Sequence, residues 1–308
     1  MEPASLPFPL PIVDHHLHLR PGPAGLESVR RFVAAGGTDL FLATQNYGPG
    51  PPTTRDGYRE QFDLTVGLAR QVERECGARA YAVVAPYPVD LIRQAEELGL
   101  LRAEALQLEA MSLAASYVED ERAVALGEVG SAHFPIEAKV AEALERILRA
   151  TIGMARDLGC PLVLHTEELL PEGYRRLGSM AGQEAISPEH LIKHYARPYR
   201  PPAERFGVTP SFLARKEIVR EALSDPGPWF LETDYLDDPS RPGAVMSLES
   251  VPKRVRELWR AAVGEGEREG LLRSLSIPFV EGPQKLYGLD LHRREPFRFP
   301  AGGPGGKG

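Results

Sequence analysis

Short apolar runs alternate with amphipathic helical stretches along most of this 308-residue chain. In the helical stretches, apolar residues recur every three or four positions and so mark one face of a helix. The short runs are nearly continuously apolar, as expected of parallel strands that are buried on both faces. Eight such runs span residues 12–19, 39–44, 80–85, 123–129, 161–165, 191–194, 206–208 and 229–234. This alternation indicates an α/β protein with a parallel sheet.

Eight strand–helix units favour a closed TIM-type (β/α)8 barrel of a single domain, which we expect over residues 1–290. A tail rich in glycine and proline follows over 291–308. An open doubly wound sheet is the alternative, but the first strand ends in histidines where that fold has its GxGxxG nucleotide turn. We predict a long loop over 168–187, and long loops of this kind often act as lids. A helix is expected to begin near Ser211, after the seventh strand.

Charge and cysteine content exclude several classes of protein. The net charge of −7 gives no overall attraction to nucleic acid or anionic membranes, so any phosphate recognition has to be local. Two cysteines, Cys76 and Cys160, cannot form a disulfide framework, which fits a reducing cytoplasm. The apolar segments are too short to span a bilayer, and prolines interrupt the N-terminal one, unlike a signal peptide. We expect a cytoplasmic protein with no membrane partner; the sequence leaves its oligomeric state open, a homo-oligomer included.

Two histidines lie one residue apart at the end of the first strand. Residues i and i+2 of a strand point to the same face, so His16 and His18 face the same way, and His15 faces the opposite way. In a barrel, the carboxyl ends of the strands form the active-site face. Two imidazoles converging there could bind a metal ion, although this motif alone is equally consistent with buried core histidines.

Four more residues of metal-ligand type end other apolar runs. They are Glu128 after the fourth strand, His165 after the fifth, His194 after the sixth and Asp234 after the eighth. A polar group in such a place is costly to bury unless it is bound. Imidazoles together with carboxylates suit Zn²⁺, Mn²⁺ or a similar divalent ion, and Glu128 could bridge two ions about 3.5–4 Å apart.

These motifs resemble, in order and spacing, those of the TatD-type metal-dependent hydrolases of the amidohydrolase superfamily, in particular the TatD-related branch. The matching segments are His16-Leu17-His18, Gly127-Glu128-Val129-Gly130, Leu164-His165, Lys193-His194 and Glu232-Thr233-Asp234. The resemblance implies two divalent metal ions, with zinc the first choice and manganese, magnesium or nickel as alternatives. It makes His16, His18 and Asp234 the ligands of one ion. His165 and His194 would bind the other ion, and Glu128 would bridge the two.

The resemblance also implies a reaction. A metal ion lowers the pKa of a coordinated water towards about 7, and an adjacent carboxylate can accept its proton. Asp234 is expected to handle this proton, so Asp234 and Glu128 are the predicted catalytic residues. Characterised relatives act as deoxyribonucleases, which implies a phosphoester substrate, DNA included. Because the same ions can polarise a carbonyl group, an amidohydrolase or lactonase acting on a small carbonyl substrate is the alternative.

Departures from the family pattern affect the expected substrate contacts. After the third strand the chain has Ala85-Pro86 where the family has a histidine-proline pair. His133 could supply the missing imidazole, or it could be an ordinary loop histidine. Arg20 and Arg241 could bind a phosphate with two hydrogen bonds each, or they could be solvated loop residues.

Overall fold

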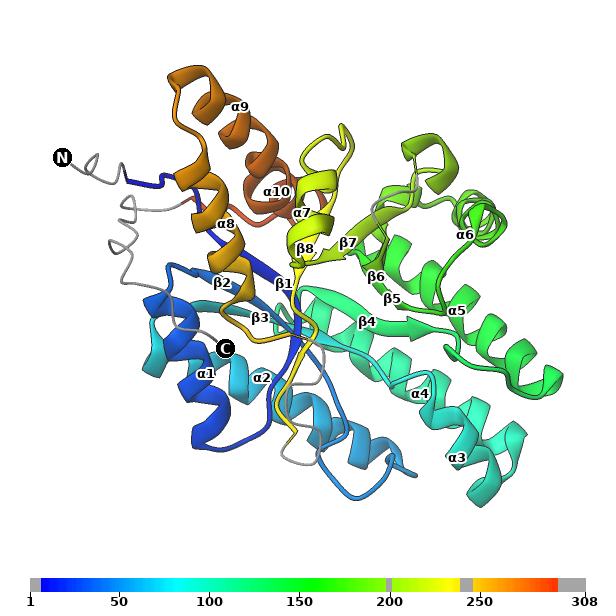
Figure 1. Ribbon diagram of the computed structural model, residues 1–308. Helices are drawn as coiled ribbons and strands as arrows, with labels where there is room; N and C mark the ends of the chain where they lie inside the picture. Colours follow the sequence, from blue (N-terminus) through cyan, green and yellow to red (C-terminus); the bar gives the residue numbers. More distant parts are fainter. Residues whose placement is uncertain (1–6, 198–200, 239–245, 293–308) are drawn as a thin grey trace.

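The structure, a computed structural model, describes residues 7–197, 201–238 and 246–292 of the chain. Within these residues, nine parallel strands form one sheet in the order β8-β7-β6-β5-β4-β3-β2-β1-β9. Helices lie around the outside of the strands (Figure 1). The strands are β1 (Val13–His18), β2 (Asp39–Ala43), β3 (Arg79–Val84), β4 (Ala125–Gly130), β5 (Leu162–His165), β6 (Leu191–Ala196), β7 (Thr209–Leu213), β8 (Phe230–Glu232) and β9 (Tyr235–Leu236).

The sheet returns to its first strand through a short connection between β8 and β9. Only Thr233 and Asp234 separate these two strands, and β9 pairs with β1 in parallel. The backbone N–H of Asp234 donates to the carbonyl of His16 at 3.0 Å. The carboxylate of Asp14 accepts hydrogen bonds from the backbone N–H (3.1 Å) and the hydroxyl (2.6 Å) of Thr233. The predicted TIM-type α/β barrel is therefore confirmed, and its first and last strands meet at these residues.

The helices bury the apolar stripes predicted from the sequence. In α2, Thr54 caps the N-terminus by accepting a hydrogen bond from the N–H of Gly57 at 3.1 Å, and the helix ends at Gly77, whose φ is 77°. A left-handed residue of this kind ends a helix at little cost when it is glycine. The described helices are α1 (Pro23–Ala34), α2 (Arg55–Cys76), α3 (Asp90–Leu98), α4 (Leu100–Glu119), α5 (Ala138–Leu158), α6 (Pro171–Gln183), α7 (Lys216–Ala222), α8 (Ser250–Ala261), α9 (Glu265–Ser276) and α10 (Gly282–Tyr287), with short η1 (Pro188–His190), η2 (Pro202–Arg205) and η3 (Ile277–Glu281).

Strand β1 shows how alternation separates the histidines. All six of its residues are buried. This is expected of a parallel strand when one face is covered by helices and the other face points into the barrel interior. The ring of His15 stacks on Phe230 with centroids 3.7 Å apart, and its Nε2 lies 2.6 Å from the hydroxyl of Tyr287. His15 is thus a packed core histidine, on the face opposite to His16 and His18.

The seventh strand differs from the prediction. It spans Thr209–Leu213, beyond the predicted 206–208, and α7 begins at Lys216, not near Ser211. Phe206 and Gly207 have φ values of 49° and 84°, which an extended strand does not allow, so they form the turn that precedes β7. Pro210, which lacks an N–H and is uncommon inside strands, concealed the true position of this strand in the sequence.

The predicted loop over 168–187 was also wrong, because it contains helix α6. Three glycines in this helix, Gly173, Gly178 and Gly182, weaken its local propensity. Packing outweighs this weakness: one face of α6 is buried, and it consists of Tyr174, Leu177, Met180 and Ala181.

Two predictions fall on residues that the structure does not describe. Arg241 lies outside the described residues, and so does the tail predicted over 291–308 from residue 293 onward. None of the described helices combines the length and the apolar character needed to cross a membrane.

Candidate metal centre

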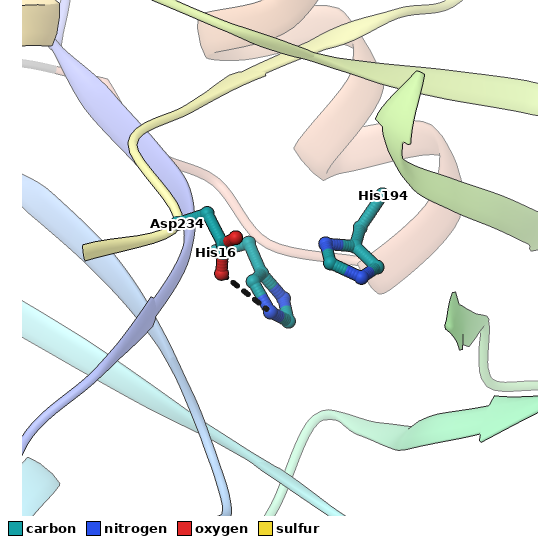
Figure 2. A group of neighbouring side chains, drawn as sticks. All are labelled: His16, His194 and Asp234. Atoms are coloured by element: carbon teal, nitrogen blue, oxygen red, sulfur yellow. Dashed lines mark ion pairs between the residues drawn. The ribbon is translucent and has the colours of Figure 1, made fainter. Parts of the chain in front are cut away.

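Six polar side chains converge at the carboxyl ends of the barrel strands. Figure 2 shows three of them: His16 and Asp234 lie side by side, with 3.9 Å between His16 Nε2 and Asp234 Oδ1, and the ring of His194 faces them. The six come from five places in the sheet: His16 and His18 from β1, Glu128 from β4, His165 from β5, His194 from β6 and Asp234 from the β8–β9 connection. The structure therefore brings together all six residues predicted as metal ligands.

Glu128 lies between the histidines. Its Oε1 is 2.9 Å from His194 Nε2 and 3.0 Å from His165 Nδ1, while its Oε2 is 3.6 Å from His18 Nε2. Three overlapping groups of potential ligand atoms result, and within each group all atoms lie within 4.8 Å of one another. The groups are His16, His18 and Glu128; Glu128, His165 and His194; and His16, His194 and Asp234.

The ring nitrogens of His16 lack hydrogen bonds within the described part of the chain, and this fits a cation-binding site. His16 is completely buried, and neither of its ring nitrogens has a hydrogen-bond partner among the described residues. Buried polar atoms nearly always have a partner, and a neutral imidazole is a common ligand of divalent ions. The donor set of four imidazoles and two carboxylates thus fits one or more divalent metal ions of the zinc type.

Other groups orient two of the imidazoles by contacting the ring nitrogen that faces away from Glu128. Nδ1 of His18 lies 3.2 Å from the carbonyl of Ala43, which leaves its Nε2 facing Glu128. Nδ1 of His194 lies 3.5 Å from Oε1 of Glu232. Glu232 is itself fixed, because its carboxylate accepts hydrogen bonds from the backbone N–H of Tyr195 at 2.8 Å and from the hydroxyl of Ser211. Partners of this kind hold a ligating ring in place and raise its basicity.

Burial and neighbouring charges shift the pKa values of the centre. Burial acts to lower the pKa of His194, but the carboxylate of Glu128 outweighs it and raises that pKa to about 10. Burial raises the pKa of Asp234 to about 7, although the charge of His194 opposes this shift. Burial also acts to raise the pKa of Glu128, but the charge of His194 and the hydrogen bonds from His165 and His194 outweigh it and hold that pKa well below its usual range. Burial lowers the pKa of His16 well below its usual value, so this ring is neutral and available as a ligand.

Comparison with known proteins identifies the family. Residues 13–269 match the family described as TatD related DNase, which is most of the chain. The chain belongs to this TatD family. An uncharacterized protein of Methanocaldococcus jannaschii is 27% identical over 288 residues, which cover 92% of this chain and 97% of that protein. Membership makes this protein a metal-dependent hydrolase.

Solved structures show the same fold at low sequence identity. A TatD homolog from Escherichia coli aligns with a TM-score of 0.57 and 18% identity, over 87% of this chain and 97% of that chain. The TatD-like protein of Archaeoglobus fulgidus aligns with a TM-score of 0.53 and 15% identity, over 86% and 100%. A mutant of a PTE-like lactonase from Deinococcus radiodurans aligns with a TM-score of 0.54 and 16% identity, over 92% and 97%.

Beside the six residues, this TatD-family protein places two further polar side chains against His165. Nε2 of His165 lies 3.0 Å from Nδ1 of His133 and 3.2 Å from the hydroxyl of Tyr87. His133 was one of the predicted substrate contacts. Tyr87 was missed, although it directly follows Ala85-Pro86, where the sequence lacks the family histidine.

The remaining candidates lie elsewhere or contribute differently. Arg20 is partly buried and lies near Tyr47. Burial raises the pKa of Tyr47 to about 12, and the positive charge of Arg20 opposes that rise. Lys193 is buried, and its ammonium donates to the carbonyl oxygens of His194 (2.6 Å) and Thr166 (3.3 Å), away from the ligand atoms.

Proposed function

We propose that this protein is a two-metal phosphoesterase in which Glu128 bridges two divalent ions, zinc being the best fit. The position of Glu128 carries the proposal, because its Oε2 lies 3.6 Å from Nε2 of His18 while its Oε1 lies 2.9 Å from Nε2 of His194. Oε1 also lies 3.6 Å from Nε2 of His16, so this carboxylate contacts histidines assigned to both ions. The first ion would be bound by His16, His18 and Asp234, and the second by His165 and His194. Such a carboxylate bridge is typical of two-metal sites that hydrolyse phosphoesters.

When bound, the ions would activate a water for attack and stabilise the charge that develops on the phosphoryl group. The side chains of the chain position the other participants. Asp234 would accept the proton of the attacking water. Its backbone N–H donates to the carbonyl of His16, and its Oδ1 lies 3.9 Å from Nε2 of both His16 and His18. His133 and Tyr87 lie at the edge of His165, where each can donate a hydrogen bond to a substrate oxygen.

The substrate of this proposal is a phosphodiester, and DNA is the substrate class indicated by the family description. A second candidate is hydrolysis of a lactone or amide. It is favoured by a cavity beside the cluster. The described lining of this cavity contains one cationic side chain, Arg176, whose Nη1 lies 3.4 Å from Oε2 of Glu145. A pocket without an unpaired cation suits a neutral carbonyl substrate.

The proposal can be tested with metal-reconstituted protein and a panel of substrates: bis(p-nitrophenyl) phosphate, single-stranded DNA, a γ-lactone and an anilide. Asp234→Asn is the test variant, and Asp237→Asn, directly after β9, is its matched control. Phosphodiester turnover that is lost only in Asp234→Asn supports the proposal. Lactone or anilide turnover without phosphodiester turnover would replace it with the second candidate.

Metal analysis of the same variants adds a measurement that does not depend on activity. Wild-type protein is expected to bind two zinc ions per chain. Glu128→Gln is expected to bind fewer than two, because the amide nitrogen of glutamine cannot ligate an ion. Retention of both ions by this variant would contradict a bridging role for Glu128.

A further inference from the structure

A cavity of about 650 Å³ opens beside His165, between the segment after β4 and helices α5 and α6. We call it the α5–α6 pocket and define it by its lining residues: 130–136, 138, 141, 142, 144, 145, 148, 166, 167, 169, 173, 176 and 177. It shares a wall with the metal centre. His133, which lines it, lies 3.0 Å from His165, and the N–H of Ser131 donates to the carbonyl of His165 at 2.9 Å. A substrate whose phosphoryl group lies at the cluster can therefore extend into this pocket.

The walls of the α5–α6 pocket are mostly apolar. Its large apolar side chains are Phe134, Ile136, Leu144, Leu148, Leu169 and Leu177. Phe134 is 43% exposed, and its ring is perpendicular to that of His133 at a centroid distance of 5.0 Å. An exposed ring beside a pocket offers a face on which a planar group can stack. The volume also lies within the range of about 300–1,000 Å³ that small-molecule sites occupy.

The charges around the pocket disfavour further phosphates. Three carboxylates line it, those of Glu142, Glu145 and Glu167, against the single guanidinium of Arg176. Arg176 lies 3.4 Å from Glu145, and Glu167 accepts a hydrogen bond from the hydroxyl of Ser131 at 2.6 Å. A polynucleotide carries one negative charge per linkage and is bound through clustered cations, which this surface does not provide.

We infer that the α5–α6 pocket binds the uncharged planar group of a small phosphoester, a nucleoside or an aryl group, while the phosphoryl group reacts at the metal centre. This inference rests on the proposed phosphoesterase function and narrows its substrate class. It assigns Phe134 a stacking role, and it makes a mononucleotide ester a better substrate than polymeric DNA.

Two phosphodiesters of equal charge test the pocket. Thymidine 5′-methyl phosphate and glycerol 3-methyl phosphate share a primary alkyl linkage, but only the first carries a nucleobase. With zinc-loaded protein we expect kcat/KM to be about 10-fold or more higher for the thymidine ester, because the base is buried against apolar walls. The thymidine ester is also expected to exceed a 20-nucleotide oligothymidylate, compared per linkage.

A variant that fills the pocket isolates its contribution. Ala141 is exposed on α5 and lines the pocket, so Ala141→Phe places a ring there without displacing the core. Ala261→Phe, at an exposed position on α8, is the matched control. We expect Ala141→Phe to lower kcat/KM for the thymidine ester about 10-fold and to leave the glycerol ester within about 2-fold, whereas Ala261→Phe changes neither.

A binding measurement separates the two proposals. Calorimetry with free thymidine and metal-free protein should show binding that Ala141→Phe weakens about 10-fold. Equal turnover of the two esters, equal loss of both in Ala141→Phe, preference for the oligonucleotide, or thymidine binding that ignores the variant would each overturn the inference while the phosphoesterase function stands. If neither ester is hydrolysed by zinc-loaded protein, the proposed function fails, and this inference fails with it.

Discussion

Replacing Glu232 by glutamine is expected to weaken metal binding while preserving the barrel. Glu232 is completely buried, and its Oε1 lies 3.5 Å from Nδ1 of His194. The carboxylate also accepts hydrogen bonds from the N–H of Tyr195 and the hydroxyl of Ser211. Glutamine keeps an oxygen for the N–H of Tyr195 and offers an amide N–H to the oxygen of Ser211, so both contacts have a replacement.

Glutamine does not replace the negative charge beside the imidazole. A carboxylate facing the second nitrogen of a ligating histidine raises its basicity, and loss of such a partner costs about 10- to 100-fold in metal affinity. Because the separation of 3.5 Å is longer than an ordinary hydrogen bond, we expect the lower end of this range. A 10-fold loss corresponds to about 1.4 kcal/mol.

The assay is competition for zinc against a fluorescent chelator, with metal-free protein as the starting material. Glu189→Gln is the matched control, since Glu189 lies in η1 and pairs with Lys285 at 2.6 Å, away from the ligand groups. The thermal midpoints of the metal-free proteins establish that Glu232→Gln is folded. Zinc affinity equal to wild type in a folded variant would refute the argument, and so would loss of the fold without metal.

Three further predictions follow from metal linkage, buried charge and packing. Because ions that bind only the folded state stabilise it by about 2.7 kcal/mol at 100 times their Kd, chelation should lower the thermal midpoint, and readdition of zinc should restore it; an unchanged midpoint would contradict a metal centre. Burial raises the pKa of Asp90 from 3.8 to about 7, so folding favours its protonated form and stability falls as pH rises between these values. In urea unfolding, the free energy of unfolding of Asp90→Asn minus that of wild type should therefore increase between these two pKa values, by about 1.36 kcal/mol per pH unit, and stay constant at higher pH. A difference that does not change with pH would contradict this cause. Leu177→Ala should lower the free energy of unfolding in urea by about 2–5 kcal/mol, because the Leu177 side chain in α6 is only 2% exposed. A decrease below about 1 kcal/mol would indicate that α6 is not packed against the barrel.

Much of the fold could be predicted because local patterns and the tertiary structure agree. Each residue of β4 is buried, so this strand consists of apolar residues and glycines except at Glu128. Strand β7 and helix α6 were mispredicted because local signals opposed the final structure. Pro210 lies inside the strand, and three glycines lie inside the helix, where packing against the rest of the barrel decides the outcome.

The candidate site divides in the same way. The six clustered residues could be predicted because each one follows or interrupts a strand, and parallel strands bring their carboxyl ends to one edge. Glu232 and Tyr87 could not, since their contacts depend on tertiary distances. Glu232 of β8 contacts His194 of β6, although β7 lies between these strands in the sheet order. The spacing of residues in the sequence does not predict a contact of this kind.

The closure of the barrel between β1 and β9 has a consequence for the newly synthesised chain. Asp234 joins the cluster only where β9 pairs with β1, and the same two-residue connection fixes Asp14 through Thr233. The ribosome makes the histidines of β1 long before it makes Asp234. A growing chain therefore carries its imidazoles without the complete set of ligands, and the full centre forms only when the last strand docks. The six-residue cluster is therefore complete only after Leu236 has been synthesised and β9 has paired with β1.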